Sequence, residues 1–395
     1  MSIVNEENKI MDIMQESLEL HRKLNGKIEI KNKMKLKDMH DMTLAYTPGV
    51  AKACLAIHEN PEEVYALTSK RNTVAVISDG SAVLGLGNIG PLAAIPVMEG
   101  KCAIFKRFAN IDAIPIVLNT QNVDELVETI YRLSPSFGGI NLEDISAPRC
   151  FEVERRLKEI CDIPIFHDDQ HGTAIVCGAA LLNALKLVQK KLREVKIVIN
   201  GAGSAGIAIT RFLIELGAKH VTVCDRFGIL YKGDPLLNSA QAEISQITNL
   251  KNVKGDLTDA LKDADVFIGV SAGNIVSEDM IRSMSEDAIV FPLANPNPEI
   301  SREKALNAGA RIVGTGVSNQ PNQINNALVF PGIFKGALES RVTQISTEMQ
   351  IAACKAIASI IKKEDLTEMN IIPNIFNNRV AKQVAKSVIK TAKSR

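Results

Sequence analysis

The sequence contains no tryptophan, and aromatic residues make up only 4% of its 395 residues. Proteins that bind single-stranded nucleic acid stack bases on aromatic side chains, so this scarcity argues against that class. Neither sign of charge is in excess, because the formal net charge is +1. No overall field therefore recruits nucleic acid or an anionic membrane surface, and we expect neither as a partner.

An uninterrupted hydrophobic run is missing as well. The most apolar stretch, Val74 to Met98, is broken by Asp79, by glycines and by two prolines, so it cannot cross a bilayer as a regular helix. The N-terminus lacks the basic segment and apolar core of a secretory signal. Seven cysteines, an odd number without CxxC spacing, argue against a disulfide framework or a thiolate zinc site. These absences together predict a cytoplasmic protein.

The chain is too long for one ordinary core, since domains average ~150 residues. Strand-like and helix-like segments alternate from residue 60 onward, which predicts an α/β fold with parallel strands. We expect two domains: an N-terminal α/β substrate domain over residues 1–164, and a Rossmann-type, doubly wound parallel sheet with C-terminal helices over residues 165–395. Residues 1–40, which include a lysine-rich stretch, should form a solvated arm. The expected strands lie at residues 72–78, 114–118, 163–166, 195–200, 221–224, 266–270, 289–293 and 311–314.

The clearest motif is GAGSAG, which contains Gly201, Gly203 and Gly206. It follows the strand VKIVIN and opens a helical segment, so the glycines can form the tight turn that brings backbone close to a pyrophosphate. A later strand ends in Asp225, 225 − 206 = 19 residues past the last glycine, where an acid can accept hydrogen bonds from ribose hydroxyls. This context predicts a nicotinamide dinucleotide site and an enzyme that transfers a hydride. The expected contacts are Gly201, Gly203, Ser204, Ala205, Gly206, Asp225 and Arg226.

The choice of dinucleotide depends on two neighbouring side chains. Asp225 favours NAD, because the 2′-phosphate of NADP would meet its negative charge, whereas Arg226 could pair with that phosphate. NADP therefore stays an alternative. A second motif with the same glycine spacing, GLGNIG at residues 85–90, is followed at once by Pro91 and by no strand that ends in an acid. We predict that it is a turn in the substrate domain.

Two adjacent acidic pairs follow predicted strand ends: Glu143 with Asp144, and Asp168 with Asp169. Strand ends are where sites form in α/β sheets, so the pairs can meet. Three converging carboxylates repel one another unless a cation offsets their charge, and oxygen-only ligands suit Mg²⁺ or Mn²⁺. The alternative is that Asp168 or Asp169 caps the helix that we expect to begin near Gly172.

His167 and His171 have the i, i+4 spacing of the zinc ligands in metalloproteases. Pro164 precedes them and Gly172 follows, so the segment should not lie in the middle of a helix, and its second residue is Asp rather than Glu. We therefore predict supporting or structural roles for both histidines.

Two further side chains are candidates for proton transfer. The segment AYTPGV at residues 45–50 predicts a rigid turn that presents Tyr46, and Lys101 is expected to begin an apolar strand, CAIF. A lysine partly buried beside a cation has its ammonium form disfavoured, which would lower its pKa towards that of a usable base. The competing interpretations are a packed tyrosine and a lysine whose charged end reaches solvent.

Taken in order, the segments YTPGV, SDGSAVLGLGNIG, MEGK, NLEDI, FHDDQHGTA, GAGSAG and NPNPE resemble those of malic enzymes, in the short bacterial form. The resemblance runs from about Tyr46 to Pro331. It implies NAD-dependent oxidative decarboxylation of L-malate to pyruvate and CO₂ with a bound Mg²⁺ or Mn²⁺, in a homodimer or a larger homo-oligomer. The implied roles are metal ligation by Glu143, Asp144 and Asp169, a supporting acid at Asp168, a general base at Lys101, a general acid at Tyr46, and substrate contact at Asn295 and Asn325.

One position departs from the pattern, because Ala82 stands where larger members of that family carry an arginine. Another group must then bind the substrate carboxylate. Two alternatives to the implied activity are malolactic turnover, in which retained NADH reduces pyruvate to lactate, and a catalytically inactive NAD-binding scaffold.

Overall fold

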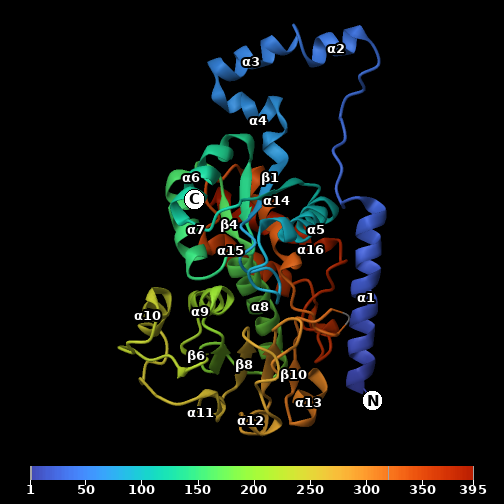
Figure 1. The fold of residues 1–395 in the computed structure, drawn as a ribbon. Coiled ribbons are helices and arrows are strands. Elements are labelled where there is room, and N and C mark those ends of the chain that lie inside the picture. Colours follow the sequence, from blue (N-terminus) through green and yellow to red (C-terminus); the bar gives the residue numbers. More distant parts are fainter. Residues whose placement is uncertain (1, 319, 395) are drawn as a thin grey trace.

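The computed structural model describes residues 2–318 and 320–394, and Figure 1 shows two stacked lobes with a sheet in each. The first sheet has the order β2-β1-β3-β4, and all of its strands run parallel. Its strands are β1 (Thr73–Ser78), β2 (Asp112–Val117), β3 (Gly139–Leu142) and β4 (Ile165–His167). Its helices are α5 (Pro91–Ala109), α6 (Val123–Leu133) and α7 (Arg149–Ile160), with the 3₁₀ turn η3 (Ser134–Ser136).

The second sheet has the order β10-β9-β8-β5-β6-β7, in which only the short edge strand β7 is antiparallel. This order reverses direction at β5, which confirms the predicted doubly wound topology. Its strands are β5 (Lys196–Asn200), β6 (His220–Asp225), β7 (Gly228–Ile229), β8 (Val266–Gly269), β9 (Ile289–Pro292) and β10 (Ile312–Val313). Its helices are α8 (Asp168–Leu187), α9 (Ser204–Leu216), α10 (Ser239–Ser245), α11 (Leu257–Leu261), α12 (Glu278–Arg282) and α13 (Arg302–Asn307).

Side chains that alternate between the two faces of β1 show how the first sheet is covered by helices on both sides. In β1, Val74 and Val76 face the core that contains Phe105 of α5, whereas Ala75 and Ile77 face the core under α6 and α7. Successive side chains of a strand point to opposite faces, so a strand covered on both faces is apolar throughout. This is why the run TVAVIS could be recognised as a buried parallel strand.

The C-terminal helices return to the first lobe and join the two sheets through one core. They are α14 (Phe330–Ser340), α15 (Thr347–Ala358) and α16 (Arg379–Lys393), with the 3₁₀ turns η4 (Asn326–Leu328) and η5 (Lys363–Asp365). The rings of Phe105 and Phe330 lie 4.7 Å apart, centroid to centroid, and those of Phe105 and Phe334 lie 5.4 Å apart. The first sheet also takes its last strand from Ile165–His167, just beyond the predicted domain boundary at residue 164.

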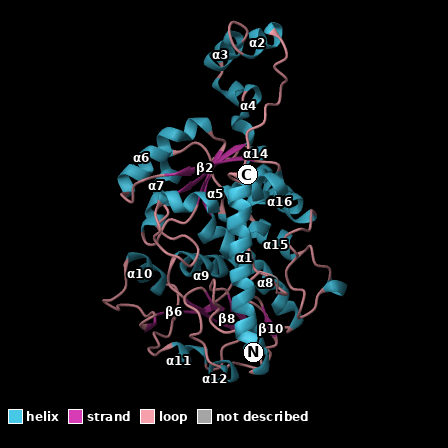
Figure 2. Cartoon of the chain, turned by 45° about the vertical axis from the view of Figure 1, so that its right-hand side comes forward, coloured by secondary structure: helices cyan, strands magenta, loops and turns pink. Residues whose placement is uncertain are grey.

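Most of the N-terminal segment lies outside both lobes, and its last turn, η2 (Ser69–Asn72), packs on β1 and α14. The segment contains α1 (Ser2–Leu24), α2 (Met39–Ala45), α3 (Val50–Glu59), α4 (Val64–Leu67) and the 3₁₀ turns η1 (Pro61–Glu63) and η2. Figures 1 and 2 show α1 running alongside the body, while α2 and α3 project beyond the first lobe. Across the described residues, none of these or the other helices combines the length and apolarity needed to cross a membrane.

Two local predictions were wrong. Lys101 lies inside α5, not on a strand, because the apolar run CAIF covers a buried helix face rather than a sheet. The helix expected to begin near Gly172 begins instead at Asp168, directly after β4, so both members of the second acidic pair lie in its first turn.

Candidate active site

The two acidic pairs meet at the carboxyl edge of the first sheet. Strand β3 ends at Leu142 and continues into Glu143 and Asp144, while its parallel neighbour β4 ends at His167. Leu142 and His167 are paired in register, so the residues that follow each strand emerge side by side. Sheet topology therefore brings together carboxylates that are 25 residues apart in sequence, as predicted for strand ends.

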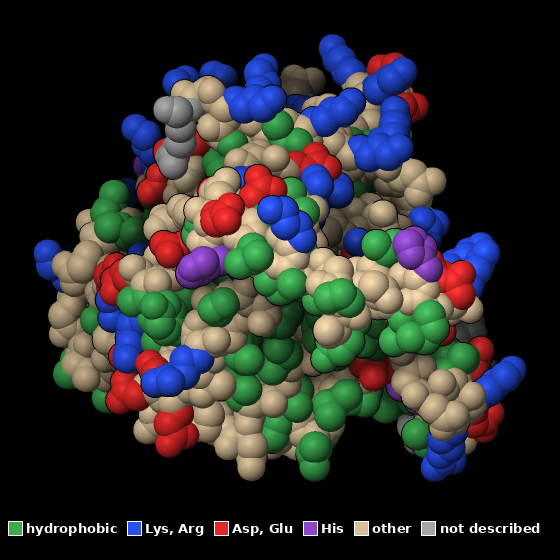
Figure 3. Space-filling view, turned by 90° about the horizontal axis from the view of Figure 1, so that it is seen from above, with side chains coloured by type: hydrophobic (Ala, Val, Ile, Leu, Met, Phe, Trp, Pro, Cys, Tyr) green, Lys and Arg blue, Asp and Glu red, His purple; other side chains and the backbone are tan. Residues whose placement is uncertain are grey.

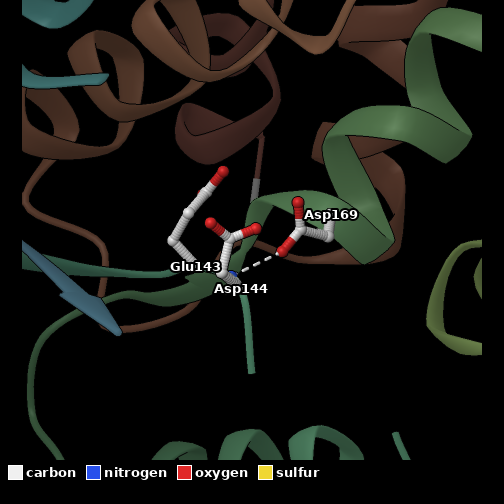
Figure 4. Close-up of side chains that lie close together, drawn as sticks. All are labelled: Glu143, Asp144 and Asp169. Atoms are coloured by element: carbon white, nitrogen blue, oxygen red, sulfur yellow. Dashed lines mark hydrogen bonds between the residues drawn. The ribbon is translucent and has the colours of Figure 1, made fainter. Parts of the chain in front are cut away.

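Three carboxylates converge in a way that suits a metal ion. Glu143, Asp144 and Asp169 each offer an oxygen, and these oxygens all lie within 4.8 Å of one another. Figure 4 shows the three side chains, with the Asp144 amide N–H donating to an Asp169 carboxylate oxygen at 2.8 Å. Asp144 adopts a positive φ of 55°, a conformation that Asp tolerates better than most residues and that turns the chain sharply after Glu143.

The electrostatics of the cluster also favour a cation. Burial, together with the charges of Asp169 and Glu143, raises the pKa of Asp144 to about 9. Burial and the charge of Asp169 likewise raise the pKa of Glu143. One oxygen of Asp144, Oδ2, is buried and has no hydrogen-bond partner among the described residues. An orphaned oxygen and crowded carboxylates fit the coordination of Mg²⁺ or Mn²⁺. The capping alternative is wrong, because α8 begins after His167 without a side-chain cap.

Lys101 projects from α5 into this cluster. Its Nζ lies 2.6 Å from Glu143 Oε1 and 2.5 Å from Asp168 Oδ2, and all three side chains are buried. Burial alone would lower the pKa of Lys101, but the carboxylates of Asp168 and Glu143 outweigh burial and raise it. The lowered pKa that the sequence predicts for Lys101 is therefore not produced by the protein's own groups. A cation that offsets the charge of Glu143 would act in the predicted direction.

Asp168 is the most enclosed member of the site. Its side chain has no exposed surface, and burial raises its pKa to about 8 against the opposing effect of Lys101. A Cβ atom placed at Gly172 would lie only 1.9 Å from Asp168 Oδ1, so the helix needs a glycine there to accommodate the carboxylate. The Oδ1 atom has no hydrogen-bond partner among the described residues. Asp168 thus has one oxygen on Lys101 and one free for another donor.

Glu154, on α7, is a residue that sequence analysis missed. Its carboxylate accepts hydrogen bonds from the backbone N–H of His167 and from Nε2 of His171, at 3.1 Å and 2.9 Å. Burial would raise the pKa of Glu154, but His171 and Lys158 outweigh burial and lower it. The ionised carboxylate clamps the β4–α8 junction that carries Asp168. His171 therefore supports this junction, as predicted, and is no partner of His167 in a zinc pair.

Tyr46 is not brought to this cluster. It follows α2 in the projecting segment, and its side chain is 68% exposed. The turn predicted at residues 45–50 is present, and the packed-tyrosine alternative is wrong, since most of the Tyr46 side chain is exposed among the described residues. Figures 1 and 2 both show α2 well away from the carboxyl edge of the first sheet.

The GAGSAG turn has the geometry expected of a dinucleotide-binding turn. Gly201 has a positive φ of 117°, and a Cβ atom at Gly206 would lie 1.6 Å from the Gly201 carbonyl oxygen. A Cβ atom added at Gly203, by contrast, would meet no atom of the described residues within 4 Å. Helix α9 starts at Ser204 with no side-chain cap, so no side chain occupies the first N–H groups of the helix, including those of Ala205 and Gly206, and a phosphate can accept from them.

Asp225 ends β6, the strand next to β5, and its Oδ1 accepts a hydrogen bond from the Phe227 N–H at 2.8 Å. Arg226 stacks its guanidinium over the Phe227 ring at 4.6 Å. Both residues therefore lie at the end of the strand next to β5, where the ribose of a bound dinucleotide is expected.

Asn295 and Asn325 lie between the two lobes. A Cβ atom at Gly85 of the GLGNIG turn would lie 2.6 Å from the Asn295 carbonyl oxygen, so the loop after β9 packs on that turn. Asn325 begins η4, which packs beside the start of α8, where Asn326 borders Gly172. The GLGNIG segment is a loop of the first lobe, which confirms its predicted assignment.

Comparison with known proteins places these features in a family. The description "Malic enzyme, N-terminal domain" matches residues 25–158, and "Malic enzyme, NAD binding domain" matches residues 170–393. The bifunctional malic/malolactic enzyme of Bacillus subtilis is 53% identical over 97% of this chain and 93% of its own length. The NAD-dependent malic enzyme of Geobacillus stearothermophilus is 51% identical over 97% of this chain and 80% of its own.

A solved structure supports the same relationship. The crystal structure of the NAD-dependent malic enzyme from Thermotoga maritima superposes with a TM-score of 0.91 at 52% identity. The alignment covers 94% of this chain and 98% of that one, so both lobes and their connection are shared.

Proposed function

The chain belongs to the malic enzyme family, and from this premise we infer that it oxidises and decarboxylates L-malate to pyruvate and CO₂ while reducing NAD to NADH. The observation that carries the inference is the contact of Lys101 with Glu143 and Asp168 in one buried cluster. A structural ion pair does not need a third and a fourth carboxylate beside it. The crowding is instead suited to a site that binds a cation and moves a proton.

Glu143, Asp144 and Asp169 are the residues that would hold Mg²⁺ or Mn²⁺. When bound, the cation would supply a Lewis acid that polarises the C2 oxygen of the substrate and stabilises negative charge on it as CO₂ leaves. Glu143 Oε2 also accepts a hydrogen bond from the Asn141 side-chain amide at 2.9 Å, and this bond fixes the orientation of the Glu143 carboxylate. The donors are oxygens only, and this favours a hard cation over zinc.

Lys101 and Asp168 are the pair that we assign to the proton of the malate C2 hydroxyl. Lys101 takes up this proton as hydride leaves C2, and its contact with Asp168 stabilises the ammonium that results. Phe330 lies under the Lys101 ammonium, 4.3 Å from Nζ to the ring centroid, and excludes water from that side. The buried setting keeps the proton within the pair.

Tyr46 is assigned to the opposite end of the reaction. Loss of CO₂ leaves the enolate of pyruvate, and C3 must then gain a proton. A phenol hydroxyl carries a proton that it can donate, so Tyr46 is the general acid in this proposal. Asn295 and Asn325 would contact the substrate beside the nicotinamide, at the junction of the two lobes.

The cofactor would occupy the GAGSAG turn, with its pyrophosphate at the start of α9 and its adenosine ribose at Asp225. Bound NAD supplies the acceptor for the hydride from C2. The choice of NAD over NADP rests on Asp225, and we also propose a cytoplasmic location and a homo-oligomeric state.

Malolactic turnover is a second candidate, favoured by the 53% identity to a bifunctional malic/malolactic enzyme. In that reaction NADH is retained and reduces pyruvate, so lactate is the product and no NADH accumulates. The deciding experiment follows NADH absorbance with L-malate, with and without EDTA, and then measures pyruvate and lactate. Metal-dependent NADH with stoichiometric pyruvate supports the main proposal, and lactate without NADH supports the second. If neither pyruvate nor lactate forms in the presence of Mn²⁺, the result supports the alternative of a catalytically inactive NAD-binding scaffold.

A further inference from the structure

Glu299, between β9 and α13, is a fully buried acid of the second lobe. Charged side chains gather at the surface, as Figure 3 shows for one face of the molecule, whereas no part of Glu299 is exposed. Backbone N–H groups hold its carboxylate, and among the described residues no basic side chain forms an ion pair with it. Burial raises the pKa of Glu299 against the opposing effect of the Ser271 and Ala294 N–H groups. Because burial of an acid without a cation costs free energy, such a residue points to a specific task.

The Glu299 carboxylate connects the ends of two neighbouring strands. Its Oε1 accepts a hydrogen bond from the Ser271 N–H at 2.9 Å, just after β8, and its Oε2 accepts one from the Ala294 N–H at 3.1 Å, just after β9. Strands β8 and β9 are parallel neighbours, so both hydrogen bonds lie at the carboxyl edge of the second sheet. A Cβ atom at Gly269 would lie 2.6 Å from Glu299 Oε1, so the glycine that ends β8 makes room for the carboxylate.

Ser271 belongs to the loop that borders the cofactor turn. The Asn200 side-chain amide donates to Ser271 Oγ at 2.7 Å, and Asn200 is the last residue of β5, directly before GAGSAG. A Cβ atom at Gly201 would lie 2.6 Å from the Val270 carbonyl oxygen, so the turn packs closely on the loop after β8. One oxygen of Glu299 therefore holds a segment that contacts the turn proposed for the dinucleotide.

The other oxygen of Glu299 holds the loop after β9, which carries Asn295, the residue that we propose contacts the substrate beside the nicotinamide. Ala294, which donates to this oxygen, directly precedes Asn295. The two loops are also connected by their backbones, since the Asn274 N–H donates to the Pro298 carbonyl oxygen at 2.9 Å. Glu299 thus lies where the cofactor side and the substrate side of the second lobe meet.

We propose that Glu299 is a positioning residue for hydride transfer, because it holds Asn295 and the loop after β9 in register with the loop that borders the cofactor turn. The inference rests on the proposed function, because the roles of Asn295 and of GAGSAG are assigned there. Hydride transfer requires C2 of malate to lie against the nicotinamide in the correct orientation, and a displacement of ~1 Å can lower a rate ~10²-fold. The hydrogen bonds of Glu299 lie within the second lobe, whereas Lys101 and the candidate metal ligands lie in the first. Decarboxylation itself should therefore not depend on Glu299.

Two reactions of the variant Glu299→Gln test this role. Gln has nearly the same size, but only one of its two terminal atoms can accept a hydrogen bond, so one of the two loops loses its acceptor. Malate oxidation should fall by up to ~100-fold. Oxaloacetate is the 2-keto acid that loss of hydride from malate yields, and its metal-dependent decarboxylation should stay close to the wild-type rate. The deuterium isotope effect on malate oxidation, measured with deuterium at C2, should rise because hydride transfer becomes the slow step.

Glu303→Gln, at an exposed acid in the first turn of α13, is the matched control. Glu299→Asp keeps both oxygens on a side chain one methylene shorter, and it should show the same separation of the two reactions if Glu299→Gln does not fold. Equal loss of both reactions, an unchanged isotope effect, or failure of both variants to fold would assign Glu299 to stability alone and overturn the proposal. Wild-type rates of malate oxidation in both variants would overturn it as well. A wild-type chain that catalyses neither reaction would instead contradict the proposed function, and with it this inference.

Discussion

The two halves of the candidate site are built from different materials. At the first sheet, the chemistry lies in side chains, since Lys101, Glu143 and Asp168 are buried and in contact. At the second sheet, the glycine turn proposed for the cofactor is shaped by its backbone, and Asp225, the side chain proposed to contact the ribose, lies at the end of β6. A change in the first half therefore removes a charge that nothing can replace, whereas a change in the second half alters shape or a screened charge. We expect losses of activity in the first half and graded losses of affinity in the second.

The largest effect should come from the candidate metal ligands. Asp169→Asn keeps the size of the side chain but removes one negative charge from the cluster of three carboxylates. Substitution of residues that only hydrogen-bond to metal ligands typically lowers metal affinity or activity by ~10–100-fold. Loss of a ligand itself should therefore lower the rate of malate oxidation by more than ~100-fold. NAD binding, measured by fluorescence titration, should be unchanged. Asp162→Asn, at an exposed acid near β4, is the matched control, and normal turnover by Asp169→Asn would remove Asp169 from the metal site.

Lys101 should show the next largest effect. Lys101→Ala removes the group that takes the hydroxyl proton, and such groups contribute ~10²–10⁴-fold to rate. The substitution removes the Lys101 ammonium that pairs with both Glu143 and Asp168. The affinity of the site for the metal should therefore be measured separately, by titration with Mn²⁺.

Lys106→Ala is the control for Lys101→Ala, because Lys106 lies on the same helix with most of its side chain in solvent. A small primary amine added to Lys101→Ala should restore part of the rate. Unimpaired malate oxidation by Lys101→Ala would show that another group acts as the base.

Two glycines of the GAGSAG turn should separate folding from binding. Alanine at Gly206 would place its Cβ 1.6 Å from the Gly201 carbonyl oxygen, so Gly206→Ala should destabilise the fold by about 1–3 kcal/mol. At Gly203 the added Cβ meets no atom of the described chain, so Gly203→Ala should leave the melting temperature unchanged and weaken NAD binding. Thermal unfolding without NAD and titration with NAD measure the two effects. If Gly206→Ala weakens NAD binding but leaves the melting temperature unchanged, the close contact of Gly206 with the Gly201 carbonyl oxygen does not limit the fold.

The sequence was sufficient to predict the β5–turn–α9 arrangement and the meeting of the acidic pairs because each has a local signature. A strand, a glycine turn, a helix and an acid at fixed spacing occur together at Lys196–Asp225, and acids directly follow strands at Glu143 and Asp168. Such short-range patterns predict the structure well, because the strands and their ends depend mainly on residues close together in the sequence.

Contacts over long sequence separations could not be predicted in the same way. The pairing of Lys101 with Glu143 joins residues 42 apart, and the apolar letters around Lys101 suit a buried helix as well as a strand. Glu154 carried no motif, and only the position of α7 beside β4 reveals that it clamps the start of α8. The exposed position of Tyr46 depends on the N-terminal helices around it, whose described residues from 12 to 72 include none that is buried, and no local pattern in YTPGV predicts this.

The smallest effect should come from Asp225, at the rim of the cofactor turn. Its carboxylate is tied to the Phe227 N–H at 2.8 Å and reached by the Gln241 amide at 3.3 Å, so it is held in place but partly solvated. Interactions of exposed charges are worth ~0.2–1 kcal/mol, and Asp225→Ala should therefore narrow a preference for NAD over NADP by less than ~10-fold. Glu215→Ala removes the same charge at the far end of α9 and should leave the preference unchanged. The measurement is the ratio of kcat/KM for the two cofactors at fixed malate and Mn²⁺. If the wild-type enzyme already prefers NADP, the neighbouring Arg226 determines the choice, and Arg226→Ala should then reduce that preference.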